Sequence, residues 1–191
     1  MDTLLALCIG LGLSAACGFR VFVPLLGLSI ASHAGHVTLA SDFAWLGSTP
    51  ALIALGFGTV LEIAGYYIPW LDHFLDTITT PAAVDAGVMV SASMITDMSP
   101  LLRWSLAVIA GGGLAATIQT TTVLARAGST LTTGGLGNPI LATLELGGSV
   151  LSTVLSLLVP VLGIAVVFGC AGLLGVYVHR RSISKQEFPG K

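Results

Sequence analysis

The sequence predicts an all-α fold, a polytopic transmembrane helix bundle of about six spans. Only 8% of its 191 residues are charged and 54% are hydrophobic, whereas a soluble domain carries roughly 25% charged residues. The mean hydropathy is +0.97. Apolar runs of about 20 residues, the length that crosses a bilayer as a helix, recur along the chain. We therefore expect one transmembrane domain over residues 1–182 and a short cytoplasmic tail over 183–191.

The first half of the chain contains three predicted spans, at residues 3–32, 51–68 and 82–98. The first is long, and Pro24 predicts a kink within it because proline interrupts helical hydrogen bonding. Pro50 predicts the start of the second span, since proline is favoured in the first turn of a helix. Between the second and third spans, apolar residues at helical spacing predict a short interfacial helix over 69–78.

The second half contains three further predicted spans, at residues 101–127, 140–158 and 160–178. A connection rich in glycine and threonine joins the first two of these. The apolar stretch 140–178 is about twice as long as one span at a rise of 1.5 Å per residue. We divide it at Pro160, and one long tilted helix or a re-entrant segment is the alternative.

Basic residues near the C-terminus predict the orientation of the chain. The only basic cluster in the sequence lies there, at His179, Arg180, Arg181, Lys185 and Lys191. Because cytoplasmic segments are enriched in lysine and arginine, the C-terminus is predicted to be cytoplasmic. With six spans the N-terminus is cytoplasmic too, and the loop 33–50, which lacks both residue types, faces the exterior.

Local similarities between the two halves suggest an internal repeat. Residues 10–16 resemble 111–116, and residues 61–65 resemble 144–148. Three spans followed by three spans would give an inverted repeat, which many transporters have. Two unrelated packing faces built from common membrane residues are the alternative.

Several motifs together resemble a known family. They are residues 12–26 around Gly18-Phe19-Arg20-Val21, then Glu62, residues 68–72 and Asp76, and finally Arg126, Ser129-Thr130, Thr133-Gly134-Gly135-Leu136-Gly137-Asn138-Pro139 and Glu145. This set resembles the bacterial family of the domain of unknown function numbered 4126, over most of the chain. The resemblance implies a small multi-pass protein of the bacterial inner membrane with no established activity.

Four charged residues within predicted spans form the first candidate site, namely Arg20, Glu62, Asp85 and Glu145. A charge near the bilayer centre costs at least about 2.5–3.5 kcal/mol, so such residues tend to be paired and functional. We expect Arg20 to be buried and to face Glu62 or Glu145, forming a charge network along a transport pathway. In the alternative, Arg20 extends to the headgroups and Glu145 only stabilises the start of its helix.

The glycine-rich connection is a second candidate, a site for an anion or polar group formed by Gly134, Gly135, Gly137 and Asn138 with Arg126. Glycines permit a tight turn, Asn138 is the expected N-cap of the next helix, and amides at a helix start attract anions. An ordinary cytoplasmic turn is the alternative.

The leading functional hypothesis is a small transporter or permease for an ion or an amphipathic anion, such as a lipid phosphate. The alternative is a non-transporting scaffold that binds lipid or a protein partner. Small residues at Gly10, Ser14 and Gly18 allow either tight packing or a homodimer. We expect no enzymatic activity, cofactor or metal, because no nucleophile–base pair or metal-ligand motif is visible. The thinly spread net charge of −2 argues against binding of nucleic acid.

Overall fold

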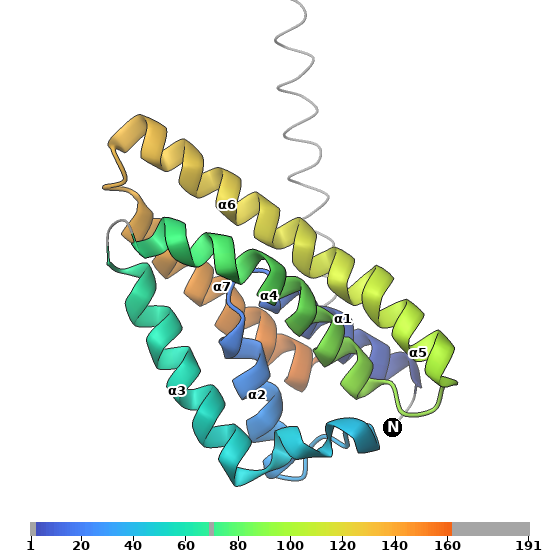
Figure 1. Ribbon diagram of the computed structural model, residues 1–191. Coiled ribbons are helices and arrows are strands. Elements are labelled where there is room, and N and C mark those ends of the chain that lie inside the picture. The colour runs from blue at the N-terminus through green and yellow to red at the C-terminus, as the bar shows by residue number, and fades with distance from the viewer. Residues whose placement is uncertain (1–2, 69–70, 162–191) are drawn as a thin grey trace, which may run out of the picture.

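The computed structural model describes residues 3–68 and 71–161, and these ranges are helical with no β-strand (Figure 1). A 3-10 helix, η1 (Ser41–Gly47), precedes α3, and a π-helix, η2 (Ala107–Gly112), joins α5 to α6. The α-helices are α1 (Thr3–Cys17), α2 (Phe22–His33), α3 (Thr49–Tyr66), α4 (Leu71–Met94), α5 (Pro100–Leu106), α6 (Gly113–Thr133) and α7 (Asn138–Leu158). The predicted all-α class is therefore confirmed for the described residues.

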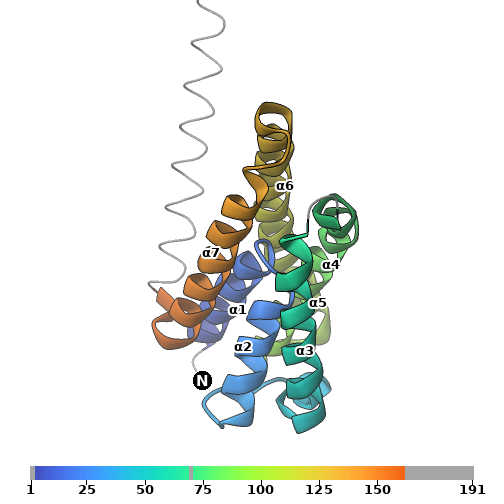
Figure 2. The same ribbon diagram turned by 90° about the vertical axis from the view of Figure 1, so that its left-hand side faces the viewer.

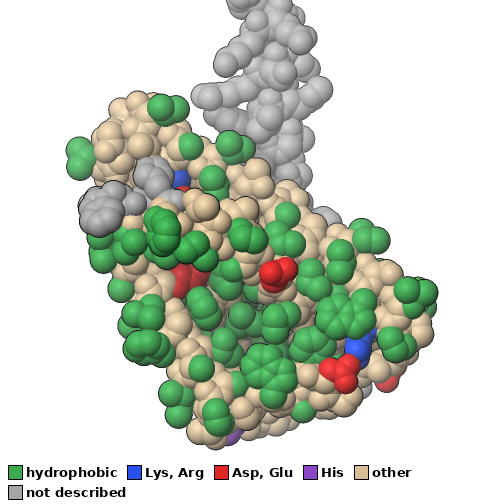
Figure 3. Space-filling model, in the orientation of Figure 1, with side chains coloured by type: hydrophobic (Ala, Val, Ile, Leu, Met, Phe, Trp, Pro, Cys, Tyr) green, Lys and Arg blue, Asp and Glu red, His purple; other side chains and the backbone are tan. Residues whose placement is uncertain are grey.

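The described helices are those of an integral membrane protein. Three segments in this part of the chain are long and apolar enough to cross a membrane, namely Thr49–Tyr66, Pro100–Thr133 and Asn138–Leu158. Large apolar side chains such as Ile53, Phe57 and Leu144 are exposed on the outside of the bundle. Figure 3 shows hydrophobic side chains spread over the whole face in view. Such a surface is stable in lipid and not in water.

The prediction of one long first span over residues 3–32 is wrong, because these residues form two short helices. α1 and α2 are separated by residues 18–21, and each is shorter than the ~20 residues that a span requires. Pro24 lies in the first turn of α2 and does not kink a longer helix. The break lies at Gly18, where an added Cβ would be 2.5 Å from Ile118 Cβ and 2.7 Å from the Ala115 carbonyl oxygen. The approach of α6 at this point therefore requires glycine.

The predicted interfacial helix over 69–78 is also wrong as a separate element. From Leu71 onward its residues belong to α4, which continues past Pro81 to Met94. An internal proline costs a helix about 3 kcal/mol. Buried small residues further along α4, including Ala83, Ala86 and Val90, pack in the core and offset this cost.

The fourth span is longer than predicted, since helix runs from Pro100 through η2 to Thr133. Threonine hydroxyls near its end donate back to carbonyls one turn earlier, as Thr132 Oγ1 does to Gly128 O at 2.9 Å. The helix stops at Gly134, whose φ of 63° is left-handed and favours glycine.

The fifth span matches α7 closely. This helix ends at Leu158, where Val159 adopts φ −138° and ψ 72°. The apolar stretch 140–178 is therefore not one uninterrupted helix. The predicted sixth span, 160–178, lies almost wholly outside the described residues.

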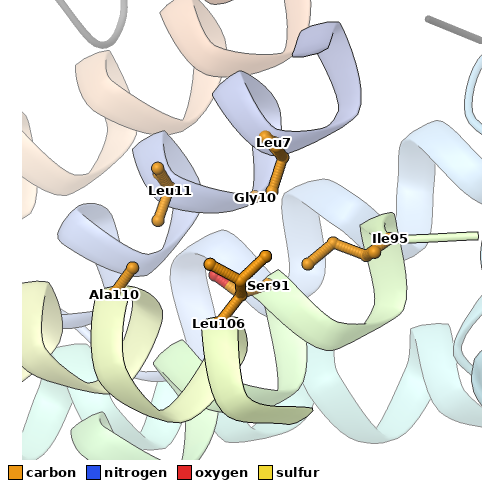
Figure 4. A pocket seen from close by; sticks show the side chains of 7 residues that line it. All are labelled: Leu7, Gly10, Leu11, Ser91, Ile95, Leu106 and Ala110. Carbon is orange, nitrogen blue, oxygen red and sulfur yellow. The ribbon is translucent and has the colours of Figure 1, made fainter. Parts of the chain in front are cut away.

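The helices pack around α1, which lies between α4 and α7, while α2 packs between α3 and α7 (Figure 2). Small residues allow α1 to approach α4. Ser14 Oγ lies 2.7 Å from the Gly87 carbonyl oxygen, to which it donates, and 2.8 Å from Ser91 Oγ. Beside this crossing is a cavity of about 120 Å³, lined by Leu7, Gly10, Leu11, Ser91, Ile95, Leu106 and Ala110 (Figure 4).

We predict that Gly87→Ala destabilises the bundle by about 1–3 kcal/mol, as overpacking usually does. An added Cβ would lie 2.6 Å from Ala115 Cβ and 2.9 Å from the Gly111 carbonyl oxygen. Gly128→Ala is the matched control, because no atom lies within 4 Å of a Cβ added there. It should stabilise α6 by up to about 1 kcal/mol. Unfolding of the detergent-solubilised variants measures both effects. Equal effects would contradict the close packing of α4 against η2 and α6 at Gly87.

An ion pair attaches the loop helix η1 to α5. Arg103 Nη2 donates to Asp42 Oδ2 at 2.6 Å, and the rings of Phe43 and Trp104 pack with centroids 6.0 Å apart. The hydrogen bond and charge of Arg103 hold the pKa of Asp42 below its ordinary value of 3.8.

This lowered pKa predicts how the attachment depends on pH. The pKa of Asp42 is lower in the folded protein than in the unfolded chain. The ion pair therefore stabilises the fold fully at pH values above the unfolded pKa, and this stabilisation is lost as the pH falls through the folded pKa. We expect Arg103→Gln to raise the pKa of Asp42 towards its ordinary value, as measured by NMR titration of the carboxyl carbon. An unchanged titration midpoint would show that Arg103 does not interact with Asp42 in solution.

Candidate functional site

The break between α1 and α2 places Arg20 inside the bundle. Its side chain is 1% exposed, and its Nη2 lies 3.4 Å from Glu145 Oε2 on α7. The same Nη2 donates to the Ala142 carbonyl oxygen at 3.0 Å. Arg20 therefore does not extend to the headgroups, and the acidic partner expected from the sequence is Glu145.

A second arginine, Arg126 on α6, binds the same carboxylate. Its Nε donates to Glu145 Oε1 at 3.0 Å and its Nη2 donates to Oε2, so the pair is bidentate. Arg126 is 2% exposed. One buried carboxylate therefore joins two buried guanidinium groups from different helices.

The sequence predicts Arg126 at the glycine-rich site, and its pairing with Glu145 is not among the predicted contacts. A signal was present, because Arg126 stands seven residues before the end of α6 and Glu145 seven residues after the start of α7. Equal distances from a tight turn bring two residues opposite each other in an antiparallel helix pair.

Tyr66, at the end of α3, contacts both arginines and was also missed. The Cζ atoms of Arg20 and Arg126 lie 3.7 Å and 4.1 Å from the centroid of its ring. Its hydroxyl hydrogen-bonds Thr79 Oγ1 on α4 at 2.8 Å, and Gln119 Nε2 on α6 donates to the same oxygen at 3.4 Å. Cation–π contacts are strongest where the cation has lost its water. We refer to Arg20, Tyr66, Arg126 and Glu145 as the arginine cluster.

Glu62, which the sequence predicts to be part of the charge network, lies beside this cluster and binds backbone amides instead. Its Oε1 accepts from the Val21 amide at 2.7 Å and its Oε2 from the Phe22 amide at 3.1 Å. The first amides of a helix have no partner within the helix, and a carboxylate there also favours the positive end of the dipole. Glu62 therefore caps α2, and among the described residues it forms no ion pair with Arg20.

Asp85 does not join the cluster. It lies on α4 with an exposed side chain, and no hydrogen bond or ion pair connects it to the described part of the chain.

The glycine-rich segment forms a left-handed turn between α6 and α7. Gly134 and Gly135 have φ values of 63° and 90°. The predicted N-cap is wrong, because Gly137 occupies the cap position and Asn138 is the first residue of α7. The Thr133 hydroxyl accepts from the Gly137 amide at 3.1 Å, and Asn138 instead donates from Nδ2 to Thr130 Oγ1 at 3.2 Å.

Amides of this turn are engaged in the turn itself. The Asn138 amide donates to the Gly135 carbonyl oxygen at 3.1 Å and the Gly134 amide to the Thr130 carbonyl oxygen at 2.9 Å. The structure thus brings Arg126 together with Arg20 and Glu145, while the glycines of the turn do not contact that group.

Three N–H-bearing atoms of the arginine cluster are buried without a hydrogen-bond acceptor in the described part of the structure. They are Nε and Nη1 of Arg20 and Nη1 of Arg126. Leaving a buried donor unsatisfied costs about 1–3 kcal/mol, and more when the group is charged. The two arginines of the cluster therefore carry hydrogen-bond donors that the described residues do not use.

The inner face of α7 is polar along most of its length, a pattern not predicted from the sequence. Its buried residues are Asn138, Ala142, Glu145, Ser149, Thr153 and Ser156. Its exposed large residues are apolar, namely Ile140, Leu144, Val150, Leu151, Val154 and Leu158. We call the buried set the α7 polar stripe. From residue 138 to 156 it extends about 27 Å at 1.5 Å per residue, close to the ~30 Å of the hydrocarbon core.

The far end of the stripe borders a larger cavity. Thr153 lines a space of about 490 Å³ between α2 and α7, together with Gly27, Val154 and Leu157. Its hydroxyl is buried and has no hydrogen-bond partner among the described residues. Within the same residues, no group of three or more His, Cys, Asp or Glu side chains is placed to hold a metal ion.

We predict that Glu62→Gln destabilises the fold by about 1.5–3 kcal/mol, since hydrogen bonds to a charged acceptor are worth that much. The amide oxygen of glutamine can replace only one of the two carboxylate acceptors. Asp85→Asn is the matched control and should stay within about 0.5 kcal/mol of the wild type. Denaturant unfolding in detergent measures both, and a neutral Glu62→Gln would show that α2 does not depend on this cap.

The comparisons with known proteins agree with the resemblance seen in the sequence. The chain matches no curated protein and no solved structure. The family model described as "Domain of unknown function (DUF4126)" matches residues 7–180, a range that contains the whole arginine cluster. The protein therefore belongs to the DUF4126 family, whose description assigns no activity.

Proposed function

We propose that this protein is a small transporter or permease for an ion or an amphipathic anion. The observation that carries the proposal is the broken helix α1–α2, which brings Arg20 to the buried Arg126–Glu145 pair. Secondary transporters commonly build their ion and substrate sites from discontinuous helices of this kind. Ionisable residues buried in a membrane bundle most often line such sites.

The α7 polar stripe supports the proposal by offering a route. Polar side chains on the inner face and apolar ones outside suit a helix that borders a polar pathway. The stripe connects the arginine cluster to the cavity at Thr153. Gly12 and Gly27 pack directly against Ser156 and Thr153, so the route is closed in this conformation. A closed route favours a carrier that alternates between states over a permanently open channel.

We further propose six spans, with the sixth at 160–178, arranged as a 3+3 inverted repeat. The matching segments 61–65 and 144–148 support the repeat, because Glu62 contacts the backbone of the α1–α2 break and Glu145 pairs with Arg20. The basic C-terminal tail supports a cytoplasmic C-terminus in the bacterial inner membrane.

A scaffold that binds lipid or a protein partner, including a second copy of the chain, is the second candidate. The observation that favours it is the extent of bonding within the arginine cluster, which joins α3, α6 and α7 to the α1–α2 break. Such a network can serve fold and register alone. Neither candidate includes an enzymatic activity.

Flux into proteoliposomes distinguishes the two candidates. The probes are protons, sodium, chloride, inorganic phosphate and a fluorescent phosphatidic acid. We expect Arg126→Gln to lower the initial rate at least about tenfold, since breaking a buried charge pair costs 2–5 kcal/mol. Arg103→Gln, at an arginine outside the cluster that pairs with Asp42, should keep the wild-type rate.

Two outcomes would reject parts of this proposal. Wild-type protein that moves none of the probes faster than protein-free liposomes would favour the scaffold. Unchanged flux through Arg126→Gln would remove the arginine cluster from the transport mechanism.

A further inference from the structure

We infer that residues 162–176 pack as an antiparallel helix on the outer face of α7, along a row of apolar residues that the described part of the chain leaves exposed. We call this row the α7 apolar stripe, and its members are Ile140, Leu144, Gly147, Leu151, Val154 and Leu158. The inference rests on the sixth span proposed above and does not depend on transport. It names the surface that this span covers and the register of the contact. Residues 162–176 themselves lie outside the described part of the structure.

The α7 apolar stripe has the spacing of a helix–helix interface. Its members follow one another at intervals of four, three, four, three and four residues, and a period of about 3.5 residues keeps one helix face against a partner. The stripe lies opposite the α7 polar stripe, and α7 itself lies at one side of the bundle (Figure 2). Leu151 and Leu158 are 57% and 74% exposed, and a Cβ added to Gly147 meets no described atom within 4 Å. The outer face of α7 therefore has room for one more helix.

The chain leaves α7 at one end of this stripe. α7 ends at Leu158, and Val159 interrupts the helix with φ −138° and ψ 72°. Pro160 and Val161 are helical again, as expected of a proline in the first turn of a new helix. Short connections join antiparallel neighbours in helical bundles. The residues after Val161 therefore start beside the end of α7 and can return along it.

The sequence of residues 162–176 carries a matching row. At intervals of three, four, three and four residues it contains Leu162, Ala165, Gly169, Gly172 and Val176. In an antiparallel pair that turns at Pro160, the two rows meet member by member, and both members of each pair are equally far from Pro160 to within one residue. The facing pairs are Leu158–Leu162, Val154–Ala165, Leu151–Gly169, Gly147–Gly172 and Leu144–Val176. Each of the three central pairs contains glycine or alanine, and such small residues let two helices approach closely in a membrane.

Lipid and a second copy of the chain are the other candidates for covering an exposed apolar face. The agreement in spacing and register favours residues 162–176, because neither lipid nor a second copy requires two rows that start at the same turn. The short connection also keeps this segment at a high effective concentration beside α7. The family match continues to residue 180, so the segment belongs to the same domain. On the α7 apolar stripe it would border the cavity at Thr153, which Val154 and Leu158 help to line.

Disulfide cross-linking of the full-length chain in membranes tests the register. The three native cysteines are first replaced by alanine, and Val154→Cys is then combined with Ala165→Cys. Facing residues bring their Cβ atoms close to the roughly 3.5–4.5 Å of a disulfide, so we expect mild oxidation to link most molecules within one chain. Val154→Cys with Val167→Cys is the matched control and should link at least about tenfold less, because two residues turn a helix by about 200°. Mass spectrometry of the digested protein identifies the linked peptides.

A change of side-chain volume gives a second readout of the same contact. Gly169→Leu would place a large side chain opposite Leu151 and should lower the thermal unfolding midpoint in detergent, as overpacking does. Adding Leu151→Ala should restore part of this loss, because contacting residues couple and the smaller side chain returns space to the pair. Gly163→Leu is the control, since residue 163 is outside the row and its effect should not change when Leu151→Ala is added.

Three cross-linking results would overturn the inference. Links between two chains, seen as dimers on a non-reducing gel, would show that the α7 apolar stripe is an interface between copies. No link of either kind would leave the stripe facing lipid, and equal linking by the control pair would reject the register.

Failure of the proposed function gives a different result. Linking together with a wild type that moves none of the flux probes would reject transport and keep the packing, whereas flux without linking would reject the packing alone. Labelling with a membrane-impermeant maleimide tests the sixth span separately. Leu136→Cys, at an exposed residue of the turn before α7, and Ser182→Cys should react from the same side of the membrane. Reaction from opposite sides would reject the span and the packing with it.

Discussion

A helix that begins or ends within a membrane-spanning bundle must satisfy its own terminal N–H and C=O groups, and the break between α1 and α2 imposes this requirement on the whole fold. Glu62 reaches from α3 to the first amides of α2. Arg20 is placed inside the bundle by the same break. It donates a hydrogen bond to the Ala142 carbonyl oxygen and forms an ion pair with the Glu145 carboxylate, both on α7. The positions of α3 and α7 relative to the break follow from these contacts.

The arginine cluster extends this constraint to α4 and α6. Arg126 binds Glu145 from α6, and the Tyr66 hydroxyl contacts Thr79 on α4. A buried ion network is weak evidence for stability, because well-packed apolar residues often do as well or better.

The sequence was sufficient to predict features that depend on local composition. Lone charges in apolar runs identified Arg20 and Glu145, and the hydropathy pattern located α3 and α7 closely. The break at Gly18 could not be predicted, because it depends on the approach of α6, whereas Pro24 was the stronger local signal. Asn138 is the N-cap that the local sequence predicts. The hydroxyl that accepts from the Gly137 amide belongs instead to Thr133, in the preceding helix, and local sequence does not indicate this contact. Tyr66 was missed because an aromatic residue near a helix end usually marks the interface.

The length of the helix Pro100–Thr133 gives an estimate of the depth of Arg126 in a membrane. Its 34 residues measure about 51 Å at 1.5 Å per residue, well beyond the ~30 Å of hydrocarbon, and tilting absorbs only part of the excess. With Trp104 placed at one boundary, as interfacial aromatics are, a helix tilted by about 20° reaches the other boundary roughly 21 residues later. That position is next to Arg126. With this tilt Arg126 lies near the edge of the hydrocarbon core, and the bundle around it, not the thickness of the membrane, separates its buried side chain from the lipid.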